Sequence, residues 1–151
     1  MKIIQSTIRY YPALGGVEEY VKRISEGLRG YGHQVCVYTS NLAQHTDRLV
    51  KLGSSDTKGV RVVRSYAFPI KLRHYPIMPF MPFEILKEKA DIIHGHCFMS
   101  FPMDVASILS WLKHIPFIFN PYFTEYCNLS FLGKLYRKTL GAFAMAAKVV
   151  I

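Results

Sequence analysis

Short runs of β-branched residues alternate along this chain with segments of helical periodicity, and this alternation limits the fold more than any other feature. The pattern predicts strands over 2–8, 34–39, 60–66, 91–96 and 116–120, and another that begins at Lys148. Strands that alternate with helices are typical of a parallel sheet covered on both faces. The sequence therefore predicts an α/β fold with a doubly wound, mostly parallel sheet.

The clearest predicted helix lies between the first two strands. Apolar residues recur at helical spacing from Val17 to Leu28, charged residues occupy the opposite face, and Gly30 and Gly32 follow. Glycine is the residue that most often ends a helix, so the helix is expected to stop there. A second helix is expected to begin near Ser100, with its apolar face extending to Leu112.

Two segments, 41–59 and 67–82, lack apolar periodicity and are expected to be loops over the core. No linker divides the 151 residues, so 1–151 is interpreted as one domain. Because Ile151 falls inside a predicted strand, we expect an excised domain or a truncated reading frame rather than a whole protein.

Cysteine usage and terminal composition point to a cytoplasmic protein. The three cysteines, Cys36, Cys97 and Cys127, are widely spaced and form no C-x-x-C pair, which favours reduced thiols over disulfides or a zinc site. The apolar start is too short for a secretory signal, and no apolar stretch is long enough to span a membrane.

Nineteen Lys and Arg against ten Asp and Glu give a formal charge of +9, which attracts phosphates, nucleic acids and anionic lipids. The chain has no basic run or nucleic-acid-binding module, so nucleic acid is not the expected partner. Segments 70–75 and 131–138 mix cations with aromatic and apolar residues. This composition suits peripheral contact with an anionic membrane surface, and equally an ordinary surface loop or helix start.

Two adjacent glycines, Gly15 and Gly16, stand between the first strand and the first helix. Without a Cβ they let backbone N–H groups approach a phosphate, and the helix dipole favours its negative charge. A simple tight turn is the alternative. The G-x-G-x-x-G spacing and an acidic ribose ligand after the second strand are both missing, so a nicotinamide or flavin dehydrogenase is not predicted.

The carboxyl end of the strand at 91–96 carries two histidines. His94 and His96 alternate with Gly95 and therefore point to the same side, and ligands bind at this edge of open α/β sheets. We expect His94 to be buried and hydrogen-bonded, and His96 to line a cleft. Apart from the adjacent Cys97 no third ligand stands at a suitable spacing, so no metal is expected.

The following strand leads into Pro121-Tyr122-Phe123-Thr124-Glu125-Tyr126, again at the ligand edge. Polar groups of Tyr122 and Glu125 would face a substrate there. The alternative is that the aromatic residues only close the edge of the core.

Three motifs together carry a family likeness. They are Pro-x-x-Gly-Gly-x-Glu over 12–18, Gly-His-x-Val over 32–35 and Asp-x-x-His-x-His over 91–96. In this order and spacing they resemble family 4 glycosyltransferases of the GT-B fold, such as the phosphatidylinositol mannosyltransferases. The resemblance implies the Rossmann-like N-terminal half of a two-domain enzyme. That half mainly binds the acceptor, whereas the absent C-terminal half binds a nucleotide-sugar donor, a UDP- or GDP-sugar, and transfer retains configuration without a metal.

We assign catalytic roles to His96 and Tyr122, donor-phosphate binding to Gly15 and Gly16, and acceptor binding to Tyr10 and Glu125. Relatives often have Pro-His or Phe-His where this chain has Pro121-Tyr122. The hydrogen-bonding role of that histidine would pass to the neutral phenol of Tyr122 or be absent.

The predicted function is therefore sugar transfer to a sugar or lipid-linked hydroxyl acceptor, with the isolated chain inactive. A non-catalytic module that binds a sugar or a lipid headgroup is the alternative. A complete small nucleotide-binding protein is a third interpretation, which the mid-strand ending disfavours.

Overall fold

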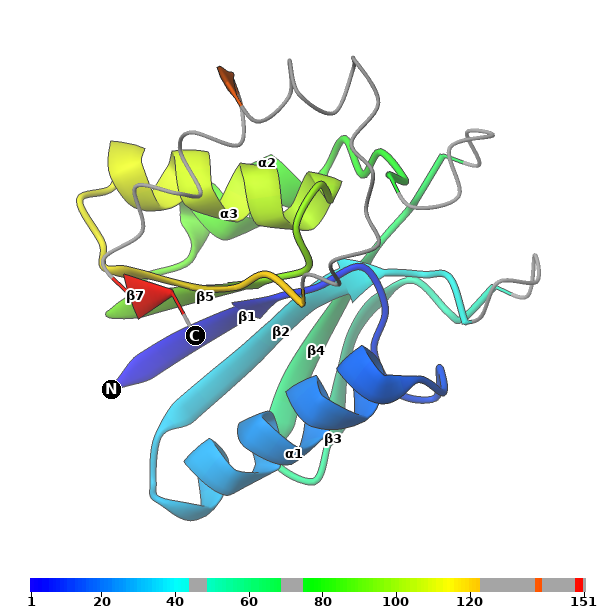
Figure 1. Ribbon diagram of the computed structural model, residues 1–151. Coiled ribbons are helices and arrows are strands. Elements are labelled where there is room, and N and C mark those ends of the chain that lie inside the picture. The colour runs from blue at the N-terminus through cyan, green and yellow to red at the C-terminus, as the bar shows by residue number, and fades with distance from the viewer. Residues whose placement is uncertain (44–48, 69–74, 123–137, 140–148, 151) are drawn as a thin grey trace.

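The computed structural model describes residues 1–43, 49–68, 75–122, 138–139 and 149–150. Its elements are β1 (Lys2–Ser6), α1 (Gly16–Gly30), β2 (Gln34–Ser40), β3 (Gly53–Thr57), β4 (Val60–Ser65), α2 (Met81–Lys87), β5 (Ile92–His96), α3 (Phe101–Leu112), β6 (Phe117–Asn120) and β7 (Val149–Val150) (Figure 1). The predicted alternation of strands and helices is confirmed.

The described strands form one seven-stranded sheet in the order β3-β4-β2-β1-β5-β6-β7. All neighbouring strands are parallel except β3 and β4. The chain runs outward from β1 to β4 and then crosses to β5 on the other side of β1. Strand order therefore reverses between β1 and β5, and open α/β sheets bind ligands at the carboxyl ends of strands beside such a reversal.

Helices cover both faces of the sheet, with α1 below it and α2 and α3 above it in Figure 1. Side chains alternate between the two cores along each strand. On β1, Ile4 belongs to the core under α2 and α3, and on β5 Ile93 does the same. Gln5, His94 and His96 consequently point to the α1 face.

The predicted end of α1 is confirmed by its hydrogen bonds. Gly32 has a positive φ of 83°, its N–H donates to Arg29 O at 3.0 Å, and the His33 N–H donates to Leu28 O at 3.1 Å. This double closure satisfies carbonyls that the helix leaves unpaired, and it needs a residue that tolerates the left-handed conformation.

The expected loop over 41–59 is wrong in its last part, because β3 forms there. Its sequence GSSDT is polar and mostly exposed, so it lacks the apolar alternation that marks a half-buried strand. The strand forms by pairing with β4 across Lys58 and Gly59, whose φ angles of 52° and 77° are both positive. Such turns match the natural twist of a hairpin, so the turn and the partner strand specify β3.

The expected loop over 67–82 overlaps α2, which begins at Met81 and was not predicted. This helix has seven residues with Pro82 in its first turn, too few for a clear helical period. The expected apolar face of α3 is confirmed for Val105 and Leu109, whereas Leu112 is 56% exposed.

No helix within the described ranges is long and apolar enough to cross a membrane. Expectations that concern Glu125, Cys127 and most of the segments 70–75 and 131–138 fall on residues outside those ranges.

Candidate functional site at the carboxyl edge of the sheet

Five polar or aromatic side chains meet on the α1 face beside the reversal of strand order. We call them the carboxyl-edge cluster: Gln5 from β1, Tyr20 from α1, His94 and His96 from β5, and Tyr122 after β6. Alternation along β1 and β5 puts Gln5, His94 and His96 on this face. Tyr20 lies on the inward face of α1. The cluster therefore combines four separate elements of the chain.

Its geometry is close-packed around His96. The Nε2 atom of His96 lies 2.7 Å from Gln5 Oε1. The ring centroid of His96 lies 4.1 Å from that of His94, and 6.1 Å from that of Tyr122 in a stacked arrangement. Tyr20 meets Tyr122 edge-on with ring centroids 5.6 Å apart. His96 thus has ring neighbours from both α1 and the turn after β6.

Both histidines are neutral at neutral pH. Burial lowers the pKa of His94 to about 4, and burial together with the neighbouring His94 lowers the pKa of His96 well below its usual value. Loss of hydration disfavours the charged imidazolium. The two rings therefore act as hydrogen-bonding groups rather than as cations.

Four buried polar atoms of the cluster have no hydrogen-bond partner within the described chain: Gln5 Nε2, His94 Nε2, His96 Nδ1 and the Tyr122 hydroxyl. Buried polar atoms are nearly always paired with protein or water, and leaving one unpaired costs about 1–3 kcal/mol. Four such atoms in one place mark a position where hydroxyl groups of a ligand or water would complete the bonding.

The sequence expectations for the two histidines are met only in part. His94 is buried at 3% exposure as expected, but its Nε2 lacks the expected hydrogen bond to any described residue. His96 is 0% exposed, so it lies beneath the surface instead of lining an open cleft. The difference arises because Tyr20 and Tyr122 pack over its ring.

The backbone next to the cluster is unusual. Three non-glycine residues after β5 and β6, Cys97, Met99 and Tyr122, have φ angles of 69°, 54° and 46°. Left-handed conformations of such residues cost on the order of 1–3 kcal/mol each and concentrate at functional sites. The Cys97 N–H donates to Asn120 O at 3.1 Å, so the two turns hold each other in this form.

The N-terminus of α1 carries the two predicted phosphate-binding glycines. A Cβ added at Gly16 would meet nothing within 4 Å, whereas one at Gly15 would overlap the Glu18 carboxylate. An acidic side chain stabilises a helix N-terminus through the helix dipole. A phosphate that binds there would displace this carboxylate, which a flexible glutamate permits.

Sequence reasoning missed Arg9, which follows β1 at the same edge. Burial and Glu18 raise the pKa of Cys97 to about 11 while Arg9 opposes them, so both charged residues lie near Cys97. The Nε of Arg9 is buried without a partner in the described chain. The signal was available, since a cation directly after the first strand belongs at the ligand edge. Tyr20 was missed because it is one of the apolar positions of the predicted first helix, and Gln5 because it lies inside a predicted strand and belongs to no motif.

Neither residue predicted to bind the acceptor, Tyr10 or Glu125, is among the described residues of the carboxyl-edge cluster. Tyr10, expected at the acceptor, is 1% exposed in the core under α1, where it packs with Val21, Val37 and Val62 among others. It presents no surface to an acceptor in this conformation. Glu125 lies outside the described residues. No three metal-ligating side chains gather in the part of the chain that the structure describes.

Residues 14–151 match the family model of Glycosyltransferase Family 4. The chain belongs to this family. Among solved structures, sucrose-phosphate synthase from Thermosynechococcus elongatus matches with a TM-score of 0.60 and 16% identity, over 99% of this chain and 41% of that one. This likeness is one of fold, the Rossmann-like half of a GT-B architecture. The sequence has no significant match among curated proteins.

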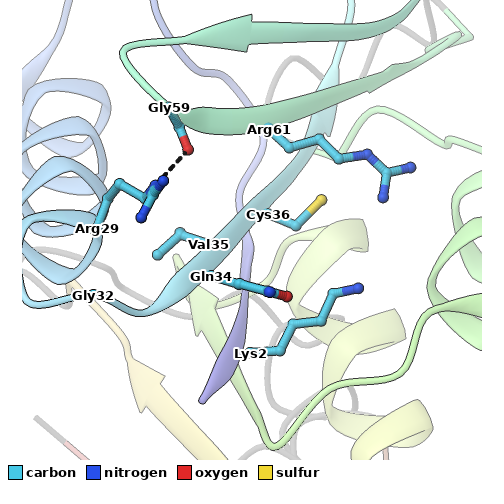
Figure 2. A pocket seen from close by; sticks show the side chains of 8 residues that line it. All are labelled: Lys2, Arg29, Gly32, Gln34, Val35, Cys36, Gly59 and Arg61. Atoms are coloured by element: carbon cyan, nitrogen blue, oxygen red, sulfur yellow. Dashed lines mark hydrogen bonds between the residues drawn. The ribbon is translucent and has the colours of Figure 1, made fainter.

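A cavity of about 390 Å³ lies at the opposite, amino edge of this glycosyltransferase domain. It is lined by Lys2, Arg29, Gly32, Gln34, Val35, Cys36, Gly59 and Arg61 (Figure 2). Its cations are already engaged, because Glu88 pairs with Lys2 and lies 2.9 Å from Arg61, and Arg29 donates to Gly59 O at 3.1 Å. The negative end of the α1 dipole also points there and opposes an anion. The family's chemistry is therefore better assigned to the carboxyl edge.

Proposed function

We propose that this chain is the acceptor-side half of a glycosyltransferase that moves a sugar from a UDP- or GDP-sugar to a hydroxyl acceptor with retention of configuration and without a metal. The observation that carries the proposal is the family match over 14–151, combined with the polar cluster at the reversal of strand order. Because the chain spans 41% of the similar sucrose-phosphate synthase, the proposal includes a second domain that holds the donor nucleotide.

Gly15 and Gly16 take the donor diphosphate in this proposal. When the bond between sugar and diphosphate breaks, negative charge builds up on the leaving group. The first N–H groups of α1 have no partners within the helix and are oriented toward that charge. The unpartnered Nε of Arg9 at the same edge is a further donor available to the phosphates.

In this proposal Tyr122 and His96 act on hydroxyl groups. Since His96 is 0% exposed, a hydroxyl reaches it only when the ring of Tyr20 or Tyr122 moves off it. Burial raises the pKa of Tyr122, so its phenol stays protonated and can donate a hydrogen bond. His96, kept neutral by burial, can accept one. Both groups recognise and orient hydroxyls rather than supply charge, which fits the chemistry of a sugar or a polyol acceptor.

Gly16→Val tests the phosphate role. Gly16 begins α1, has no positive φ and leaves open space around a Cβ, so the fold should accept valine. Side-chain bulk at the helix N-terminus would obstruct the phosphate, and transfer by the two-domain protein should fall about tenfold or more.

Gly27→Val is the matched control, since Gly27 lies in the same helix and a Cβ added there would also meet nothing within 4 Å. It should keep full transfer. Transfer and melting temperature that are both unchanged in Gly16→Val would remove the phosphate role.

A non-catalytic module that binds a sugar or lipid headgroup is the competing function, and the phenol of Tyr122 in place of a family histidine is the feature that favours it. Binding of a nucleotide sugar without turnover by the two-domain protein would support that alternative.

We also propose an anionic membrane surface as a partner. Besides the +9 charge, the supporting observation is that Phe80 and Phe83 are each 62% exposed at α2.

A further inference from the structure

A glutamine amide is buried in the middle of the parallel sheet. Gln5 is 0% exposed in β1, between Ile4 and Ser6, and its neighbours across the sheet are Val37 and His94. Glutamine is seldom fully buried, and its amide must find partners to offset the lost hydration. The only hydrogen-bond contact of its side chain within the described residues is with His96 Nε2, at 2.7 Å.

This contact determines where the imidazole proton is. An amide oxygen can only accept, so His96 Nε2 must carry the hydrogen and donate it to Gln5 Oε1. A neutral imidazole has one N–H, and Nδ1 therefore keeps a lone pair and remains an acceptor. His96 Nδ1 is buried and unpartnered in the described chain, so its acceptor capacity is free.

Packing prevents the ring from leaving this orientation. The titratable groups that face His96 are His94 from the same strand, Tyr20 from α1 and Tyr122 after β6. These rings surround the imidazole, while the strand register fixes Gln5 opposite His94 and thereby brings its amide to Nε2. A flip of the His96 ring would break its hydrogen bond with Gln5 Oε1, and this oxygen would then be unpaired in addition to Gln5 Nε2.

We propose that Gln5 is a positioning residue that holds His96 as the neutral tautomer protonated on Nε2, so that the buried Nδ1 stays a hydrogen-bond acceptor for a substrate hydroxyl that reaches the carboxyl-edge cluster. The inference rests on the proposed function for what Nδ1 would accept, whereas the tautomer itself is a property of the chain alone. Such an arrangement removes the need to reorganise the ring when a substrate binds.

The tautomer can be read directly by ¹⁵N NMR of the histidine side chains in the 151-residue chain at pH 7. We expect His96 to show a protonated Nε2 and an unprotonated Nδ1, with the Nε2 proton shifted downfield by its hydrogen bond. A proton on Nδ1 would mean that the Gln5 amide is reversed, and it would overturn the inference.

Two substitutions of Gln5 separate positioning from simple packing. Gln5→Met has nearly the same shape and no acceptor, so the hydrogen-bond shift should disappear. Gln5→Glu keeps an acceptor oxygen, so Nε2 should stay protonated, and its negative charge should raise the titration midpoint of His96 by about 1–3 pH units. Gln34→Met, at the exposed start of β2, is the control and should change neither signal.

Unchanged NMR shifts of His96 in Gln5→Met, or an unchanged titration midpoint of His96 in Gln5→Glu, would overturn the inference that Gln5 positions His96. In the two-domain protein, Gln5→Met should lower kcat about threefold to tenfold, as expected for one lost neutral hydrogen bond. Wild-type kcat in that variant would refute the role of Gln5 in transfer without touching the proposed function, which the Gly16→Val comparison tests separately.

Discussion

Acidification from pH 7 to pH 5 should destabilise this domain because two histidines are buried in their neutral form. An unfolded histidine titrates near pH 6.5, whereas burial lowers the pKa of His94 in the folded chain to about 4. Below pH 6.5 the unfolded state therefore binds a proton that the folded state does not. The resulting loss of unfolding free energy is absent above pH 6.5. Below that pH it grows by roughly 1.4 kcal/mol per pH unit for each such histidine, until the pKa of the folded state is reached.

At pH 5 this difference amounts to about 2 kcal/mol for His94 alone. His96 adds to the loss in the same direction, since its pKa is lowered as well. A loss of about 2 kcal/mol corresponds to a melting temperature lower by about 4–8 °C in a domain of this size. Carboxylates act at lower pH. Burial raises the pKa of Glu88, but hydrogen bonds from Lys2 and Tyr38 outweigh it and lower that pKa overall, so its contribution to stability is lost only under stronger acid.

Urea unfolding at pH 7, 6 and 5 measures the effect. His94→Leu should reduce the pH dependence by about one proton, because it removes one of the two titrating groups. His114→Asn is the control: His114 is exposed at the end of α3 and has a positive φ that asparagine tolerates. An unfolding free energy that stays constant from pH 7 to pH 5, or a His94→Leu variant with the full wild-type slope, would refute the reasoning.

Two further predictions concern packing and charge. Gly95→Ala should destabilise the domain by about 1–3 kcal/mol in thermal or urea melts, because the added Cβ would lie 2.7 Å from the Phe117 ring and 3.4 Å from Met103; wild-type stability would show that the ring moves aside freely. The chain should sediment with anionic vesicles more than with neutral ones at 0.1 M salt, and this preference should fade at 1 M salt, where screening acts over about 3 Å. Equal sedimentation with both vesicle types would exclude an electrostatic membrane contact.

Much of the fold was predictable because its signals are local. Strand bounds differed from the structure by only one or two residues at an end, and the end of α1 was correctly located from Gly30 and Gly32. The polar strand β3 and the seven-residue α2 were missed for one reason. Neither has enough apolar periodicity of its own, and each is specified by the element beside it.

The candidate site was only partly predictable. His94 and His96 were recognisable as a pair on one strand at the ligand edge, and Tyr122 as the next polar group along that edge. Tyr10 occupies an equally suggestive place in the sequence after β1, yet the structure turns its ring into the core under α1. Position next to a strand end thus indicates the edge, but not the direction of a side chain in the turn that follows.

By itself the sequence determined the α/β class, the strands and helices that carry apolar periodicity, the glycine turn before α1 and the family likeness, because all of these depend on neighbouring residues. Only the tertiary structure decided that Gln5 meets His96, 91 positions later, and that Tyr20 and Tyr122 pack over the same imidazole. Those contacts depend on which strands become neighbours and in which register. Strand order is selected by the whole buried core rather than by any local pattern, so the proton on His96 follows from tertiary packing.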